Sequence, residues 1–358
     1  MSIESDLKKD GITVIEPLDT TTVNVIAKNV SEKIVTAFSN LGFDFDTLYE
    51  RFSKLPMYIA NMPEGMSEAS YFYKNSAVYF RDGMGLADLE KFAVHELIHN
   101  FQEQKDEKGN LTRLGLCTFK GSKPTGMALN EAAVQLLASN ILENTFETAT
   151  YYDITFSTIS PNCYPLLCNL IYQMAYVTGD EVLFESTFNS NDHFKNKFVA
   201  LCGENTYNQV SNYFDKILET EEKIIKISNK IQNTDLSISR AKSLYKKSDE
   251  LKKQLKNAYF SAQELIISTY FSNLSKDLIT SVDIDRFRKK LYSFQDLIGT
   301  TSSYSFFNNY YIEMMENLDN KFNVLSNVSS TYNTYLIPKK INKFTKFINY
   351  IKSVIFAH

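Results

Sequence analysis

Two histidines and a glutamate lie within five consecutive residues of this chain, His95-Glu96-Leu97-Ile98-His99. If the segment is helical, the two histidines lie one turn apart on the same face, because side chains at positions i and i+4 are neighbours on a helix. Two imidazoles so placed can bind one zinc ion, and Glu96 beside them can take a proton from a water molecule on the metal. The spacing therefore predicts a zinc site suited to hydrolysis.

The motif is improbable by chance because histidine is rare, with 4 among 358 residues. A chance His-Glu-x-x-His is expected on the order of 0.003 times in such a chain. The alternative is a surface helix that carries two histidines by coincidence. The surrounding apolar residues favour a helix packed inside a domain, since they lie on several of its sides. These residues are Phe92, Val94, Leu97, Ile98 and Phe101.

A hydrolytic zinc site needs three protein ligands and an open position for water. Glu103 is too distant for the third ligand, because the Cα atoms of residues 95 and 103 would be about 12 Å apart on a straight helix, whereas ligand bonds are only about 2 Å. The better candidate is Glu131, in a largely apolar predicted helix with the small residues Ala132 and Ala133. A carboxylate among apolar side chains needs a cation nearby, which zinc would supply. Alternatively, Glu131 lies at the solvent edge or pairs with a lysine.

The sequence His95-Glu96-x-x-His99 followed by Asn130-Glu131 resembles the gluzincin zinc metallopeptidases, the broad group that includes thermolysin-like enzymes. The residues of the motif, His-Glu-Leu-Ile-His, are also similar to those of clostridial neurotoxin light chains. The resemblance implies a zincin-like fold and a peptide or protein substrate. It further implies that Zn²⁺ is bound by both histidines and Glu131, with Glu96 as the general base.

The chain departs from the thermolysin pattern four residues after the glutamate ligand, where Gln135 replaces the expected aspartate. Such a residue normally fixes the tautomer and ring orientation of a ligating histidine. We expect Gln135 to accept a hydrogen bond from an imidazole, more weakly than a carboxylate, and Asn130 to support the site from beside Glu131. Tyr164 and His193 are candidates by residue type for stabilising the developing oxyanion, and Tyr164 is the one we place in the site. With 22 tyrosines in the chain, a structural role for Tyr164 is the alternative.

Short strands are predicted before the metal helix, at residues 56–60, 71–73 and 76–80. The last of these would be an edge strand that binds the substrate backbone by strand addition, through Ser76, Val78 and Phe80. A plain structural hairpin is the alternative. The metal helix is predicted to begin near Leu86 and to end before Gly109, and a second helix at residues 128–143 would carry Glu131.

The predicted fold class is α+β. A zincin-like domain with a small mixed or antiparallel sheet would occupy residues 1–205, and an α-helical bundle or coiled region would occupy residues 206–358. The second part contains one glycine and one proline, so long helices are expected at 207–232, 235–271, 283–297 and 303–326.

Composition excludes several classes of protein. A net charge of −4 argues against general nucleic-acid binding. The N-terminal residues carry mixed charges and no apolar core, and no window of eighteen apolar residues occurs, so neither a signal peptide nor a spanning helix is predicted. Four cysteines without metal-site spacing are expected as free thiols in a reducing compartment, which favours a cytoplasmic location.

The last stretch, residues 339–356, combines an apolar stripe with five lysines and no acidic residue. Such a helix can lie on an anionic membrane surface or dock onto the helical bundle. Two alternatives to an enzyme therefore remain: a zincin-like protein without turnover that binds a partner, or an effector that acts at a membrane surface. The sequence does not indicate an oligomeric state.

Overall fold

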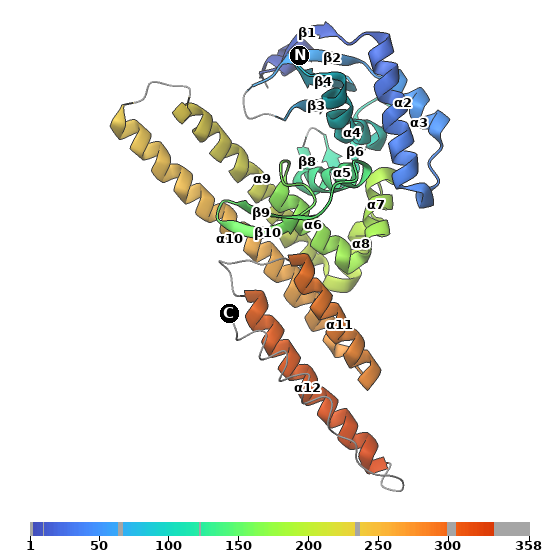
Figure 1. The fold of residues 1–358 in the computed structure, drawn as a ribbon, viewed down its shortest axis with the longest axis vertical. Coiled ribbons are helices and arrows are strands. Elements are labelled where there is room, and N and C mark those ends of the chain that lie inside the picture. Colours follow the sequence, from blue (N-terminus) through green and yellow to red (C-terminus); the bar gives the residue numbers. More distant parts are fainter. Residues whose placement is uncertain are drawn as a thin grey trace.

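The computed structural model describes residues 3–9, 11–63, 67–121, 123–232, 237–298 and 306–332. Over these residues the chain is a mixed α and β protein in which helices predominate, with small sheets in the first half and long helices in the second (Figure 1). The predicted α+β class with a helical C-terminal region is confirmed.

The first part of the chain contains a sheet and the helix that carries the histidine motif. Its elements are α1 (Ile3–Lys9), β1 (Thr13–Pro17), α2 (Thr20–Ala37), η1 (Ser39–Leu41), α3 (Phe45–Ser53), β2 (Met57–Asn61), β3 (Ala69–Phe72), β4 (Ala77–Arg81) and α4 (Leu86–Gln102). Asp19 caps α2 by accepting from the backbone amide of Thr22, and Asp44 caps α3 in the same way. Each cap satisfies an amide that has no partner within the first turn.

The four strands of this sheet are ordered β1-β2-β4-β3, with β2 and β4 parallel and the other pairs antiparallel. The prediction that residues 76–80 form an edge strand is therefore wrong, because β4 is hydrogen-bonded on both sides. Its backbone groups are already used by β2 and β3. The two edge strands are β1 and β3, and β3 is the one that packs beside α4.

The helix with the histidine motif begins at Leu86 as predicted but ends at Gln102, well before Gly109. The chain turns into a second sheet there, and the helix end is held from outside: the carbonyl of Gln102 accepts from Ser190 Oγ at 2.6 Å. The second sheet is a meander of β5 (Glu103–Lys105), β6 (Leu111–Leu114), β7 (Cys117–Lys120) and β8 (Lys123–Thr125).

The next segment carries Glu131 and includes elements that were not predicted from the sequence. It contains α5 (Met127–Ile141), β9 (Glu147–Tyr151), β10 (Ile154–Thr158), α6 (Pro165–Thr178), α7 (Asp180–Asn189) and α8 (His193–Cys202). The strands β9 and β10 form an antiparallel hairpin. The prediction of a helix over 128–143 is confirmed by α5.

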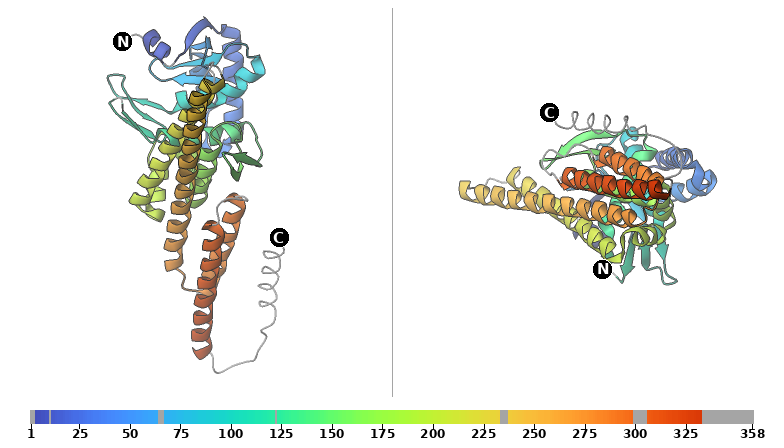
Figure 2. Two further views of the ribbon diagram at one scale, coloured as in Figure 1. Left: turned by 90° about the vertical axis from the view of Figure 1, so that its left-hand side faces the viewer. Right: turned by 90° about the horizontal axis from the view of Figure 1, so that it is seen from below.

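The remaining described residues form α9 (Glu204–Gln232), α10 (Ile238–Lys276), α11 (Ser281–Ile298) and α12 (Phe306–Tyr332). The four long helices predicted here are confirmed within a few residues at their described ends. Figures 1 and 2 show α9 and α10 running alongside each other past the first half of the chain, with α11 and α12 extending beyond it. Lack of glycine and proline explains these lengths, because nothing interrupts the backbone hydrogen bonds.

Helix α5 lies between two hydrophobic cores. One side, including Val134 and Leu137, packs with α2, α3, α4 and the first sheet. The other side, including Ala132 and Ala133, joins a core that continues through α6, α9, α10 and α11. The proposed boundary between residues 205 and 206 therefore does not separate two cores.

We expect Glu221 of α9 to make the stability of the fold depend on pH. It is 6% exposed, and burial raises the pKa of its carboxyl to about 7, against the opposing hydrogen bond from the Tyr151 hydroxyl. As the pH rises from 4.5 to above 7, the unfolded chain releases this proton first, so the folded state loses stability. We expect this residue to lower the free energy of unfolding of the unmodified protein by about 3 kcal/mol over this interval, measured by urea unfolding at each pH. In Glu221→Gln this part of the pH dependence should be absent. Glu222→Gln, an exposed neighbour, is the control, and parallel curves for Glu221→Gln and the unmodified protein would contradict the prediction.

Among the helices described, none combines the length and apolar character that crossing a membrane requires. The four cysteines are free thiols, as predicted, and three of them are buried. The predicted amphipathic helix at 339–356 lies outside the described residues, so its membrane contact stays a prediction.

Candidate metal centre

Helices α4 and α5 bring His95, His99 and Glu131 together. The two histidine Nε2 atoms are 3.0 Å apart, and each lies 3.4 Å from an oxygen of Glu131. Atoms about 2 Å from one zinc ion at tetrahedral angles are themselves about 3.3 Å apart. The side chains of His95 and Glu131 are 13% and 17% exposed, so the cluster reaches the surface. The three residues therefore fit a zinc ion with an open fourth position.

The charges of the cluster also suit a cation. Burial by itself would lower the pKa of His95, but the hydrogen bond that it donates to Glu131 and the charge of Glu96 raise the pKa to about 8. Burial by itself would raise the pKa of Glu131, but the charge of His99 and the hydrogen bonds of both histidines hold it below its ordinary value. The carboxylate is thus ionised, which is the form that binds a metal.

Gln135 orients His95, as predicted. Its Oε1 lies 2.9 Å from His95 Nδ1, while its Nε2 donates to Ser160 Oγ at 3.0 Å. Ser160 in turn donates to the carbonyl of Cys163, so its oxygen is the acceptor for the amide. The chain of bonds fixes the proton on Nδ1 and leaves the Nε2 lone pair for a metal. The Nδ1 atom of His99, by contrast, has no hydrogen-bond partner among the described residues.

Removing this orientation is expected to weaken zinc binding. Gln135→Leu should lower the affinity for Zn²⁺ about 10- to 100-fold, because His95 Nδ1 loses its acceptor and the imidazole is free to rotate or change tautomer. Competition with a chromophoric chelator measures the affinity. Gln135→Glu keeps an acceptor and should retain tight binding. Equal affinities for the leucine variant and the unmodified protein would show that the hydrogen bond has no such role.

Glu96 lies on α4 between the two histidines and points to the edge strand. Its Oε2 accepts from the backbone amide of Tyr71 in β3 at 2.6 Å, and only 7% of the residue is exposed. Burial raises the pKa of its carboxyl, and the charges of the two histidines oppose the rise. Glu96 is therefore adjacent to the cluster without being one of its three convergent ligands.

The ring of Tyr164 lies near the cluster, with its centroid 6.3 Å from that of His95, and its role at the oxyanion stays a prediction. Its backbone is in the left-handed region, with φ of 48°, immediately before Pro165 opens α6. Such a conformation is unfavourable for a large side chain and is kept where surrounding structure holds it, often at functional sites. Burial and the charge of Glu131 raise the pKa of Tyr164 well above its usual range, so the phenol keeps its proton.

Asn130 forms no hydrogen bond with a histidine among the described residues. Its side chain accepts from the Leu116 amide at 2.9 Å and donates to Gln102 at the end of α4. Gly115 makes room for this link, because a Cβ there would lie 2.1 Å from Asn130 Oδ1. The predicted support is thus indirect: Asn130 ties the start of α5 to the end of α4.

The other predicted site residues lie elsewhere. Ser76 precedes β4 and hydrogen-bonds Glu103, and Val78 and Phe80 are buried within the sheet. Glu103 pairs with Lys105 and takes no part in the metal cluster, as the helix geometry predicted. His193 lies at the start of α8, 3.5 Å from Glu185.

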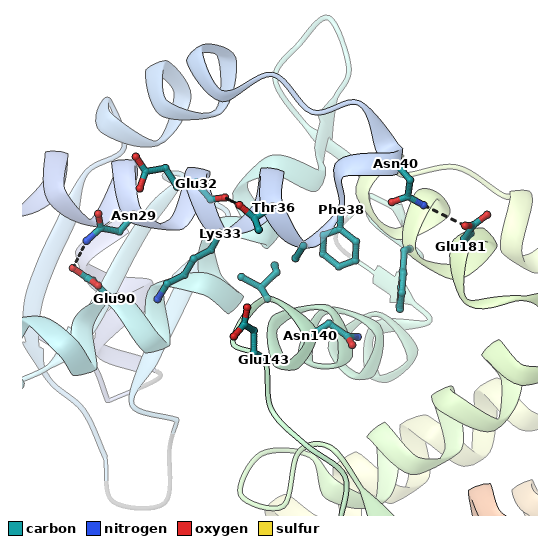
Figure 3. Close-up of a pocket in the computed structure, with 13 residues that line it drawn as sticks. Asn29, Glu32, Lys33, Thr36, Phe38, Asn40, Glu90, Asn140, Glu143 and Glu181 are labelled. Atoms are coloured by element: carbon teal, nitrogen blue, oxygen red, sulfur yellow. Dashed lines mark hydrogen bonds between the residues drawn. The ribbon is translucent and has the colours of Figure 1, made fainter.

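A hollow of about 710 Å³ lies away from this cluster, among α2, α4, α5 and α7 (Figure 3). Figure 3 shows two of its acidic side chains held by amides: Asn29 donates to Glu90 at 2.7 Å and Asn40 to Glu181 at 3.3 Å. It contains neither histidine of the motif nor Glu131. The hollow is therefore separate from the cluster.

Two groups that contact residues of the site were not predicted from the sequence. The backbone of Tyr71 and the hydroxyl of Ser160 act through contacts between distant segments, and neither has a local signal in the sequence. Comparison of the chain with protein-family models, curated proteins and solved structures gave no match.

Proposed function

We propose that this protein is a zinc-dependent peptidase that hydrolyses peptide bonds. The observation that supports this most is the convergence of His95, His99 and Glu131 at separations that suit tetrahedral zinc, with Glu96 beside them. A zinc ion bound there would polarise the scissile carbonyl and make water acidic near neutral pH. The proposal includes a zincin-like character for the surrounding domain.

The side chains around the cluster have distinct roles in this proposal. Glu96 accepts the proton of the attacking water and delivers it to the leaving amine. The amide of Tyr71 holds the Glu96 carboxylate in place. Tyr164, protonated and beside His95, donates a hydrogen bond to the developing oxyanion.

Strand β3 replaces residues 76–80 as the proposed binding edge for the substrate backbone. The amide of Tyr71 points away from β4 towards α4, and in an antiparallel ladder the carbonyl of the same residue points to the same side. Because the Tyr71 amide is bonded to Glu96, an extended peptide added to this edge would donate to the Tyr71 carbonyl.

The test is hydrolysis of casein and of a peptide library by the purified protein, with and without a zinc chelator. We expect cleavage that the chelator removes and that added Zn²⁺ restores. Stoichiometric zinc without cleavage of any substrate would instead favour a metal-binding protein without turnover. Cleavage that the chelator leaves unchanged would contradict the zinc mechanism.

A further inference from the structure

The two histidines of the cluster are supported in different ways. His95 is oriented by the hydrogen bond between its Nδ1 atom and Gln135. The corresponding Nδ1 atom of His99 is buried and has no hydrogen-bond partner among the described residues, and only 4% of the residue is exposed. A ligating imidazole normally donates its second N–H to an acceptor that fixes the ring. The orientation of His99 therefore depends on the groups that pack against its ring.

Tyr71 of β3 packs beside the imidazole of His99. The two rings are nearly parallel, with an angle of 15° between their planes and 6.5 Å between their centroids, which is within the range of interacting aromatic pairs. His95 also contacts His99, through an edge at 4.8 Å, but His95 is itself a candidate ligand. Tyr71 is only 9% exposed, so its ring has little room to move. It is thus the support for His99 that comes from outside the metal helix.

A chain of hydrogen bonds fixes the ring of Tyr71. The amide Nδ2 of Asn100 donates to the Tyr71 hydroxyl at 3.2 Å, and Arg51 Nε donates to Asn100 Oδ1 at 2.9 Å. Arg51 Nη2 also donates to the backbone carbonyl of Asn100. Because a guanidinium can only donate, the Asn100 oxygen must face Arg51, and its amide nitrogen must face Tyr71. The phenol is therefore held by residues of α3 and α4.

The backbone of Tyr71 serves a second residue of the site. Its amide donates to Glu96 Oε2 at 2.6 Å, while its ring lies beside His99. One residue of the edge strand thus contacts both a candidate ligand and the proposed general base. The hydrogen bonds from Arg51 through Asn100 fix the ring end of Tyr71, and the contact with Glu96 fixes its backbone end.

We propose that Tyr71, held by Asn100 and Arg51, is a positioning residue of the metal centre. Its ring sets the orientation of the His99 imidazole, and its amide sets the orientation of the Glu96 carboxylate. Tyr71 acts through these two residues and needs no contact with the metal. The inference rests on the proposed zinc-dependent function, and it adds a support for the site that lies outside the histidine motif.

The test compares two substitutions of Tyr71. Tyr71→Phe keeps the ring and the amide but loses the hydroxyl that Asn100 holds, and Tyr71→Leu loses the ring as well. We expect the affinity for Zn²⁺, measured by competition with a chromophoric chelator, to fall about threefold in the first variant and at least about 10-fold in the second. The visible absorption spectrum of the Co²⁺-loaded protein, which reports the geometry of the ligands, should change in Tyr71→Leu.

The matched control is Phe72→Leu on the same strand. Phe72 is 8% exposed, and its side chain lies on the opposite face of the sheet, where it contacts Tyr79. Its replacement loosens the sheet without touching His99, so the zinc affinity should stay within about twofold and the Co²⁺ spectrum should not change. Equal zinc affinities in the two leucine variants would overturn the inference. If Tyr71→Leu does not fold, an unchanged zinc affinity in Tyr71→Phe would overturn it instead.

These measurements need no turnover, so their outcome is distinct from that of the peptidase test. Unchanged zinc affinity and an unchanged Co²⁺ spectrum in Tyr71→Leu, together with cleavage that a chelator removes, would reject the positioning role and leave the peptidase proposal intact. A graded loss of zinc affinity in a protein that cleaves no peptide would support the positioning role and reject the peptidase proposal.

Discussion

Glu96→Gln is expected to lower kcat/KM for peptide hydrolysis by at least about 1,000-fold while one zinc ion per chain is retained. Glutamine cannot accept a proton from water, whereas its amide oxygen can still accept the Tyr71 hydrogen bond that positions the side chain at 2.6 Å. The metal ligands are untouched, because Glu96 is not one of the three convergent residues. Hydrolysis of a fluorogenic peptide and elemental analysis of the same sample measure the two quantities.

The matched control is Glu90→Gln on the same helix. Glu90 accepts from Asn29 at 2.7 Å, away from the cluster, so this variant changes charge equally and should keep full activity. Full activity in Glu96→Gln would remove the general-base role. Loss of zinc from that variant would place Glu96 among the ligands and contradict the assignment of the metal centre.

Glu131→Ala is expected to weaken Zn²⁺ binding by on the order of 1,000-fold or more and to abolish hydrolysis. The substitution removes the carboxylate that lies 3.4 Å from both histidine Nε2 atoms and leaves two ligands from a single helix. Chelator competition gives the affinity, and elemental analysis after dialysis gives the metal content.

Glu143→Gln provides the control for this variant, because Glu143 is exposed just after the same helix. It should bind zinc as the unmodified protein does. Stoichiometric zinc bound with unchanged affinity by Glu131→Ala would show that the third ligand comes from another residue.

The parts of the site that could be predicted are those set by short-range geometry. The spacing of His95 and His99 requires only a helix, and the helix start at Leu86 follows the apolar pattern. Glu131 could be inferred because a carboxylate in an apolar helix needs a partner, and its helix is indeed buried on two sides. The long C-terminal helices follow from the absence of glycine and proline within them.

The edge strand could not be placed because sheet order depends on pairing between distant segments. One signal was available: Ala77, Val78, Tyr79 and Phe80 are all apolar and all buried, a pattern typical of a strand covered on both faces. Glu221 offered a similar signal, as an acidic residue in an apolar stripe. The Gln135–Ser160 contact offered none, because it joins residues 25 positions apart that are separated by the β9–β10 hairpin.

The core that α5 shares with α6, α9, α10 and α11 has a consequence for dissecting this protein. A fragment that stops near residue 205 would expose the apolar side of α5 to water, so its metal ligand would no longer be held rigidly. Calorimetry should record one cooperative melting transition for the body that contains this core, at a midpoint that climbs with the free zinc concentration, because the ion binds the native chain and not the denatured one.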